Sequence, residues 1–370
     1  MELYTLDSTF LRQDIVDDYN SAIWTERYGT AGDVTLVVPL SKANIKKYPE
    51  GIFLSTPASN EVMILESIYK DYDACTLKCT GPTLTKFLNN RFLRSSDYGN
   101  DRNWHLPKDL YLNVFEAMEK LVAETCIVGG AYTRSNYFAI PNLSLGDISA
   151  FSDAHQSAWT LQWGPIYDTL AAIAQQYSVG FKLYLEHADQ NGYSLKFLPY
   201  AGSYKSEVQF SSELDNFSHI KELHSIENLK HLVIAYSPGE VHAAPESAIY
   251  GYLPQGRFGF DLRVEELICD DLQDFSGYFG DLASILYDRA QKEIATHHPS
   301  IVVDGEITPN SMFQIGRDYG LGDIVKLKAM DGDAMDSRVT EYILSSDNTG
   351  VRNYPTLAPL TDTAQPPMSS

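Results

Sequence analysis

The chain has little positive charge, few cysteines and no long apolar segment, and each shortage excludes a class of protein. Lys and Arg total 28 against 49 Asp and Glu, which gives the 370 residues a formal net charge of −21. A chain that is this acidic is a poor candidate for binding nucleic-acid phosphates or anionic lipid through its general surface. Its 4 cysteines exclude a disulfide framework and fit synthesis in a reducing compartment.

Apolar runs in the chain are no longer than one strand. The longest, VTLVVPL at 34–40 and HLVIAY at 231–236, fall far short of the roughly 20 residues that span a bilayer. The first residues, MELYTLDSTFLRQD, carry neither the basic nor the apolar region of a secretory signal. We therefore expect synthesis in a cytoplasm and no membrane anchor.

Aromatic residues are plentiful, with 24 Tyr and 16 Phe. Tyr suits half-buried sheet faces, and acidic, Tyr-rich, strand-rich chains are often assembly or binding proteins, although an ordinary β-rich protein explains the same composition equally well. Hydrophobic residues at 44% and charged residues at 21% are globular values. At roughly 150 residues per domain, the length predicts two or three domains.

Short alternating strands at both ends of the chain predict a β-dominated α+β fold. Apolar residues alternate along Asp33–Pro39 after a glycine turn, and six or seven such strands predict a first antiparallel β-barrel, or a sandwich, over 1–82. Strand patterns return at 206–240 and 300–360. We assign these two segments to a second, split β-barrel.

Helical patterns interrupt the strands and predict two insertions. Residues 83–205 are assigned to an α+β insertion that ends in a hairpin over 181–197. Its three expected helices begin at Thr83, Pro107 and Pro165. A second insertion over 241–299 contains a helix expected at 280–296, and the polar end, 361–370, is expected to be a flexible tail.

One pattern occurs near both ends of the chain. Tyr48-Pro-Glu-Gly51 and Tyr319-Gly-Leu-Gly322 each precede a strand, a polar turn and a second strand in which a Glu, Glu66 or Glu341, lies between apolar residues. A duplicated β module would explain the pattern. A chance likeness between two strand-turn-strand sequences is the alternative.

Motifs for catalysis and phosphate binding are missing from the sequence. GxxxxGK[ST], HExxH, GxSxG and CxxC do not occur. Asp331, Asp333 and Asp336 alternate as in a calcium loop, but the central Gly and distal Glu of such a loop are missing. A glycosidase pair stays open, because nothing singles out two of the 49 carboxylates. We expect no enzymatic activity, no cofactor and no bound metal.

The stretch AIWTERYGTAGDVTLVVP at 22–39 resembles the opening of a family of siphophage minor tail proteins, the tail-tip or baseplate-hub proteins of long-tailed phages of Gram-positive hosts. An aromatic residue, an Arg-aromatic pair, a Gly turn and a strand ending in Pro carry the resemblance. Further segments resemble family markers in the same order, at 80–91, 208–216, 319–325, 338–341 and 354–356.

The resemblance implies a hub protomer with two homologous, tail-tube-like β-barrels separated by α/β insertions. Three copies would form a ring that continues the tail tube at the tail tip of the virion. Genomic DNA would be ejected through this ring without specific binding, which a net charge of −21 favours. The implied partners are other copies of the chain, distal tail protein, tape measure protein and tail fibre or receptor-binding proteins.

Seven residues in these segments are candidates for interface or structural roles. They are Trp24, Arg27, Tyr28, Gly81, Arg91, Tyr319 and Gly322. Trp24 and Tyr28 are candidates for contacts between barrels, although their aromatic side chains fit an ordinary core better. Gly81 is expected to mark the exit from the first barrel, in a conformation that a Cβ would disfavour.

Two other functions stay open. A receptor- or carbohydrate-binding tail protein would use exposed aromatic rings, for which the first insertion offers Trp104, Trp159 and Trp163. A tail-associated hydrolase would need a catalytic group that the sequence does not single out.

Overall fold

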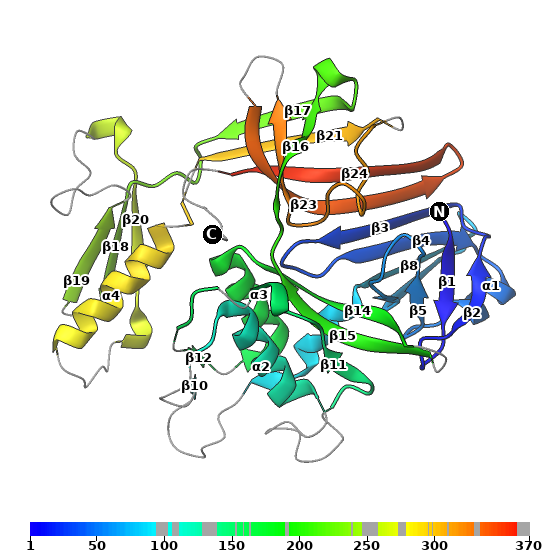
Figure 1. Cartoon of the computed structure of the whole chain (residues 1–370), viewed down its shortest axis with the longest axis horizontal. Helices are drawn as coiled ribbons and strands as arrows, with labels where there is room; N and C mark the ends of the chain where they lie inside the picture. The colour runs from blue at the N-terminus through cyan, green and yellow to red at the C-terminus, as the bar shows by residue number, and fades with distance from the viewer. Residues whose placement is uncertain are drawn as a thin grey trace. The chain divides into compact units, whose positions relative to one another are not determined.

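Two compact units make up the chain (Figure 1). The first unit comprises Met1–Ile220 and Asp304–Ala358, and the second comprises Lys221–Val303. The computed structural model describes residues 1–93, 103–105, 111–127, 139–151, 154–157, 159–162, 164–188, 192–237, 240–245, 258–272, 279–294, 296–297, 299–308, 311–328 and 334–360.

A ten-stranded sheet is the main feature of the first unit. Eight strands follow one another in the order β17 (Phe217–Ser225), β21 (Ser300–Ile307), β24 (Gly350–Pro359), β23 (Ala334–Asp347), β3 (Ser21–Arg27), β4 (Asp33–Pro39), β8 (Thr76–Pro82) and β7 (Ser67–Asp71). β23 also pairs with β22 (Ile324–Lys328), which pairs with β16 (Tyr204–Ser211). The chain passes into the second unit within β17 and returns within β21.

A smaller sheet completes the N-terminal part of the first unit. Its order is β2 (Arg12–Val16), β1 (Leu3–Leu6), β5 (Phe53–Ser55) and β6 (Met63–Ile64), and α1 (Lys42–Lys47) lies between β4 and β5 in the chain. Alternation along β4 turns Val34, Leu36 and Val38 inward, where they share one buried cluster with Leu3 and Leu54 of the smaller sheet. The N-terminal strands therefore form a two-sheet sandwich.

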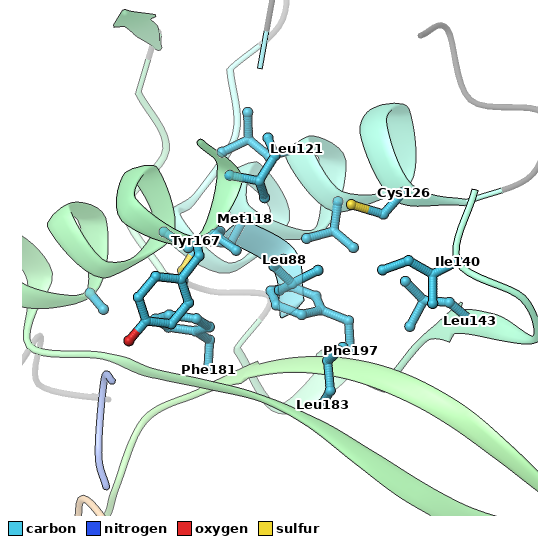
Figure 2. Packing of buried hydrophobic residues seen from close by; sticks show 14 of the residues in the cluster. Leu88, Met118, Leu121, Cys126, Ile140, Leu143, Tyr167, Phe181, Leu183 and Phe197 are labelled. Carbon is cyan, nitrogen blue, oxygen red and sulfur yellow. The ribbon is translucent and has the colours of Figure 1, made fainter. Parts of the chain in front are cut away.

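Helices and a long hairpin form the second core of the first unit (Figure 2). These elements are η1 (Leu84–Asn90), a 3₁₀ helix, α2 (Val114–Cys126), α3 (Ile166–Tyr177), β14 (Gly180–Ala188), β15 (Gly192–Tyr200) and β11 (Leu143–Leu145). α2 begins at a capping box in which the Asn113 side chain accepts from Glu116 N and the Glu116 carboxylate accepts from Asn113 N. Met118 and Leu121, from the apolar stripe of α2, belong to the same buried cluster as Phe181 and Phe197 of the hairpin.

Short elements connect these parts. They are β9 (Phe92–Leu93) paired with β13 (Gly164–Pro165), β10 (Asn103–His105) paired with β12 (Thr160–Gln162), and the 3₁₀ turns η2 (Ser149–Phe151) and η3 (Ser212–Leu214). Two further 3₁₀ turns, η4 (Gly259–Asp261) and η5 (Asp270–Leu272), belong to the second unit.

The second unit is a three-stranded sheet with one helix. β18 (Leu232–Ser237) lies between β19 (Glu240–Pro245), to which it is antiparallel, and β20 (Val264–Ile268), to which it is parallel. Val233 and Ala235 of β18 share a buried cluster with Leu286 and Ala290 of α4 (Phe279–Ile294). None of the described helices, in either unit, is long and apolar enough to cross a membrane.

The predicted β-dominated α+β class is confirmed, whereas the barrels take another form. The described strands form open sheets, and none of these sheets closes on itself. β18, which we expected in the second barrel, belongs to the second unit, and this unit starts at Lys221 rather than at 241. Strand periodicity does not specify which strands pair, so the sequence could not separate a sandwich from a barrel.

Predictions for the helices were partly right. The helix expected from Pro165 is α3, and the one expected at 280–296 is α4. The segment from Thr83 forms a 3₁₀ helix instead of an α-helix. The helix expected from Pro107 is α2, described only from Val114. The expected tail, 361–370, lies outside the described residues.

Candidate assembly site at the junction of two strand arrays

Two four-stranded arrays with the same internal order make up the eight-strand path of the large sheet. In the first array, β3-β4-β8-β7, the hairpin of β7 and β8 is placed so that β8 lies beside β4. In the second array, β17-β21-β24-β23, the consecutive strands β23 and β24 take the same places, with β24 beside β21. Antiparallel pairing of β23 with β3 joins the arrays. We call the strands of each array first to last by their position in the sheet, so that β17 and β3 are first strands and β23 and β7 are last strands. The junction thus joins the last strand of one array to the first strand of the other.

The same arrangement leaves one edge free at each end of the path. Among the described strands, β7 pairs only with β8, and β17 only with β21. Tyr69 of β7 is 63% exposed. Unpaired N–H and C=O groups on such an edge are a template for pairing with another chain. β7 is the last strand of its array, as β23 is at the junction, and β17 is the first strand of its array, as β3 is at the junction.

The repeated Tyr-x-x-Gly pattern has the same backbone geometry at both places. Gly51 and Gly322 have φ values of +85° and +87°. Gly51 N donates to Leu65 O at 2.7 Å, and Leu65 N donates back to Ile52 O at 3.0 Å. Two residues on one strand thus face one on the other, which is a glycine bulge.

The second copy of the bulge repeats these bonds. Gly322 N donates to Val339 O at 2.8 Å, and Val339 N donates to Asp323 O at 2.9 Å. Leu65 therefore corresponds to Val339, so that Glu66 corresponds to Thr340 and the two glutamates of the sequence pattern are one residue out of register. The surroundings also differ, because β1 is antiparallel to β5 whereas β16 is parallel to β22.

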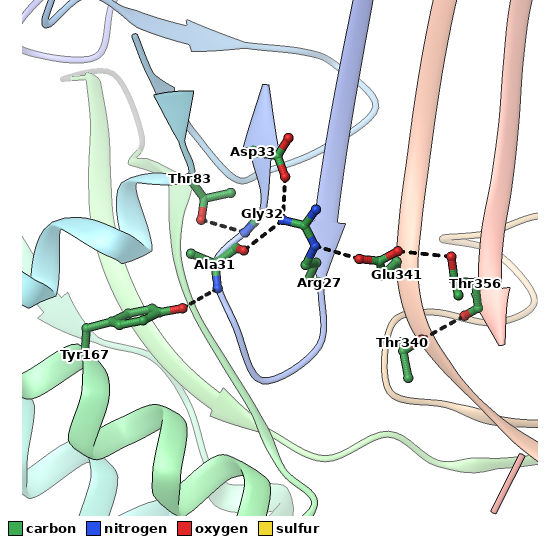
Figure 3. A network of polar contacts seen from close by, with 9 residues as sticks. All are labelled: Arg27, Ala31, Gly32, Asp33, Thr83, Tyr167, Thr340, Glu341 and Thr356. Atoms are coloured by element: carbon green, nitrogen blue, oxygen red, sulfur yellow. Dashed lines mark hydrogen bonds and ion pairs between the residues drawn. The ribbon is translucent and has the colours of Figure 1, made fainter. Parts of the chain in front are cut away.

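Arg27 is the ionic centre of the junction (Figure 3). Its guanidinium donates to Asp33 Oδ1 at 2.5 Å on β4, to Glu341 Oε1 at 2.6 Å on β23, and to Ala31 O at 3.2 Å. Glu341 Oε2 in turn accepts from Thr356 Oγ1 of β24 at 3.1 Å. Burial lowers the pKa of Arg27, but the bonds to Glu341 and Asp33 outweigh that effect and raise the pKa. The network links four neighbouring strands across the junction.

Tyr28 links the junction to the helical core. Its hydroxyl donates to Ser178 O at 2.9 Å, at the C-terminal end of α3. Its ring meets the Tyr200 ring edge-on, with centroids 5.5 Å apart, and the Arg338 guanidinium lies 5.4 Å from the ring centroid. Burial raises the pKa of Tyr28, with Arg338 acting in the opposite direction, so the phenol stays neutral at ordinary pH.

Two glycines make room for the Tyr28 ring. A Cβ on Gly322 would lie 2.2 Å from the ring, and a Cβ on Gly180 would lie 2.6 Å from it. Arg338, which is 7% exposed, donates from Nη1 to Gly322 O at 2.8 Å. The structure therefore brings together Arg27, Tyr28 and Gly322 of the seven sequence candidates.

Trp24 and Tyr319 lie in cores within the first unit. Trp24 is 0% exposed and donates from Nε1 to Glu26 Oε1 at 2.8 Å. Tyr319 is 4% exposed and packs edge-on against Phe210, with centroids 5.3 Å apart. Both side chains thus have their contacts inside the unit.

Gly81 and Arg91 lie away from the junction. Gly81 pairs with Val34 inside β8, one residue before the strand ends. Its φ is outside the left-handed region, but a Cβ there would lie 1.8 Å from Ile64 O. Arg91 follows η1, and its carbonyl accepts from Ile166 N at 2.8 Å.

Most of the side chains suggested for other functions lie outside the part of the chain that the structure describes. Trp159 is 7% exposed and donates to Leu112 O at 2.9 Å. Its ring is therefore not exposed for stacking against a sugar. The side chain of Trp104, and Trp163, lie outside the described residues, as do Asp331 and Asp333. In the part of the chain that the structure describes, no three His, Cys, Asp or Glu side chains are grouped to hold a metal.

Sequence reasoning missed three residues of the site, two of which contribute side chains and one, Ser178, a backbone carbonyl. Arg338 lies in a segment that we had singled out, but as a strand marker and not for its charge. Tyr200 and Ser178 contact Tyr28 from the insertion. Nothing in the local sequence of either residue indicates a contact with Tyr28, which lies 150 residues before Ser178 and farther still before Tyr200.

Comparisons with known proteins identify one family and proteins of similar fold. A family described as Siphovirus ReqiPepy6 Gp37-like protein matches residues 1–248. The 43 kDa tail protein of prophage MuSo2 from Shewanella oneidensis is similar in structure, with a TM-score of 0.58, 12% identity, and coverage of 99% of this chain and 100% of that one. A tail protein from Neisseria meningitidis MC58 gives a TM-score of 0.51 and 12% identity, with 99% and 98% covered. No curated protein matches the chain.

Proposed function

Because the chain belongs to the Siphovirus ReqiPepy6 Gp37-like family and has the fold of phage tail proteins, we propose that it is a structural hub protein of a phage tail tip or baseplate. In this proposal three copies form a ring that continues the tail tube. The ring serves as the conduit for DNA ejection and as a platform for other tail proteins. A Gram-positive host, implied by the sequence resemblance, stays a prediction.

The observation that carries the proposal is the order of the strand arrays. The two arrays share one order and meet last strand to first strand, at β23 and β3. Each protomer keeps one free last strand, β7, and one free first strand, β17. Repeating the junction between protomers, with β7 of one copy against β17 of the next, gives a heterologous contact of the kind that generates rings.

Three copies make this ring six arrays long. The path contributes eight strands per protomer, so three protomers give three times eight, or 24 strands. Closure removes both free edges, which would otherwise favour uncontrolled association. The described strands of one chain form no closed barrel, so in this proposal the closed barrel is a property of the assembly. The similarity of the two arrays further favours their origin by duplication.

A DNA conduit needs an axial surface that does not hold phosphates. The net charge of −21 works against such binding. Arg27, the cation at the centre of the junction, is already paired with Asp33 and Glu341. The proposed role requires no catalytic residue and no cofactor. Distal tail, tape measure and tail fibre or receptor-binding proteins are the proposed neighbours in the virion.

Tyr69→Lys tests the proposed contact. Lys on an edge strand opposes strand pairing between chains, so we expect the trimer of the wild type to become a monomer in sedimentation velocity experiments. Tyr72→Lys is the matched control, because Tyr72 is 73% exposed but lies in the turn after β7, and this variant should remain trimeric. A Tyr69→Lys trimer as stable as the wild type would overturn the proposed edge pairing.

A further inference from the structure

A cavity of about 870 Å³ lies inside the first unit, where the two arrays meet. Glu26 of β3 and Tyr342 of β23 are register partners across the junction, and both line the cavity. Register partners project from the same face of a sheet. The Glu26 carboxylate and the Tyr342 ring therefore share the face of the sheet that bounds the cavity.

The cavity extends from an exposed rim to a buried base. Pro57, Ala58 and Gln314 line it and are exposed, whereas Tyr319, at 4%, and Tyr342, at 7%, are buried. The cavity therefore connects solvent with side chains at the junction. Pockets of roughly 300–1,000 Å³ enclose most of a drug-sized ligand, so this cavity has room for a short peptide segment.

Glu26 is a buried carboxylate with little hydrogen bonding. The residue is 9% exposed, and its Oε1 accepts from Trp24 Nε1 at 2.8 Å. Among the described residues, Trp24 is the only donor to this carboxylate. The second oxygen, Oε2, has no partner there but is not fully enclosed, so it is open to the cavity. A buried carboxylate with one donor is poorly compensated for the water that it has lost.

The charge of Glu26 acts on the tyrosine beside it. Burial raises the pKa of Tyr342, a hydrogen bond with Asn353 lowers it, and the charge of Glu26 raises it. This effect agrees with the strand register, which places the two side chains next to each other. The base of the cavity thus combines a carboxylate with an aromatic ring.

The cations that line the cavity are paired elsewhere. Lys182 Nζ donates to Asn60 Oδ1 at 3.4 Å. Arg352 Nη2 donates to Thr349 Oγ1 at 3.1 Å, in the turn between β23 and β24. Neither cation forms an ion pair with Glu26. The described residues thus leave the Glu26 charge without a positive partner.

An organic cation suits this cavity better than a metal ion. No three His, Cys, Asp or Glu side chains of the described residues are grouped to hold a metal, and Ca²⁺ or Mg²⁺ needs several oxygen ligands. Four tyrosines line the cavity instead: Tyr200, Tyr319, Tyr342 and Tyr354. Ammonium and guanidinium groups are attracted to the faces of such rings. Guanidinium is the more weakly hydrated of the two and the better suited to buried ion pairs and to stacking.

We propose that the cavity binds an arginine side chain of a neighbouring tail protein. The guanidinium donates to Glu26 Oε2 and lies against the tyrosine rings, while the segment that carries it fills the outer part of the cavity. The ion pair supplies the donors that Glu26 lacks. The partner rests on the proposed function, because it is drawn from the tail. The cation preference of the cavity does not, since the site lies within one protomer.

Titration of the full chain with two peptides tests the site. One is Ala-Ala-Arg-Ala-Ala, acetylated and amidated, and the other carries citrulline, which has the shape of arginine without its charge. The Trp24 indole N–H resonance reports binding, because this group donates to the other oxygen of Glu26. We expect the arginine peptide to shift this resonance to saturation. The citrulline peptide should bind at least about 10-fold more weakly.

Glu26→Gln removes the charge but keeps an acceptor for Trp24. We expect this variant to bind the arginine peptide at least about 10-fold more weakly than the wild type does. Glu66→Gln is the matched control, because Glu66 is exposed and does not line the cavity. This control should bind the arginine peptide as tightly as the wild type does.

Four results would overturn the proposal. The first two are no binding of the arginine peptide to the wild type and equal binding of both peptides. The third is unchanged binding by Glu26→Gln. The fourth is binding of agmatine as tight as that of the arginine peptide, which would mean that the site takes a small cation and not a protein segment. The peptide comparison uses the wild type, so it holds even if Glu26→Gln does not fold. A monomeric wild type that binds the arginine peptide would contradict the ring but support this site.

Discussion

Gly81 and Gly322 show how single residues set the distance between strands. Each lies where a side chain would collide, Gly81 with the Ile64 carbonyl and Gly322 with the Tyr28 ring. Gly322 also needs its positive φ of +87° for the bulge. The sequence indicated both glycines as turn or exit positions. It could not show the collision, because each partner lies in another segment of the chain.

Gly81→Ala should destabilise the first unit by about 2 to 3 kcal/mol, because the added methyl group would have to displace backbone rather than a flexible side chain. Urea unfolding of the purified chain measures the change. Gly164→Ala is the matched control, since the nearest atom there is 3.9 Å from the built Cβ, and its effect should stay within about 0.5 kcal/mol. Equal stability of the two variants would show that the strands near Gly81 move apart easily.

At the scale of elements, the sequence predicted individual helices and hairpins better than it predicted which strands pair in the sheets. The α3 helix, the α4 helix and the β14–β15 hairpin follow from periodicity and turn residues alone. The neighbours of β3 do not, because β23 reaches it from more than 300 residues away in the chain. The 3₁₀ form of η1 was also missed, since apolar spacing does not distinguish it from an α-helix.

Tyr28 joins three elements, β3, the end of α3 and the bulge before β22. Tyr28→Ala should cost about 3 to 5 kcal/mol, because it leaves a cavity among packed rings. Tyr28→Phe removes only the hydroxyl bond to Ser178 O and should cost about 1 kcal/mol. Thermal unfolding of both variants checks the ranking. Similar losses in the two variants would mean that the hydrogen bond, and not ring packing, fixes the insertion to the sheet.

At the scale of the whole molecule, the chain has the features of one subunit of a larger assembly. Its large sheet has an internal junction, β23 with β3, and free edges of the same two kinds. The sequence resemblance implied two closed barrels in one protomer. In the proposed ring the open arrays would close only in the assembly, which would explain why the strand patterns resemble barrels although no described sheet closes.

Single-particle electron microscopy of the purified full chain is the decisive test of the proposed ring. We expect threefold particles with an open axial channel, whose wall is a 24-stranded barrel in which β7 of each protomer lies beside β17 of the next. Native mass spectrometry of the same sample should give three protomers. Monomers at every concentration tested, or a twofold dimer with β7 and β17 both exposed to solvent, would contradict the proposed ring.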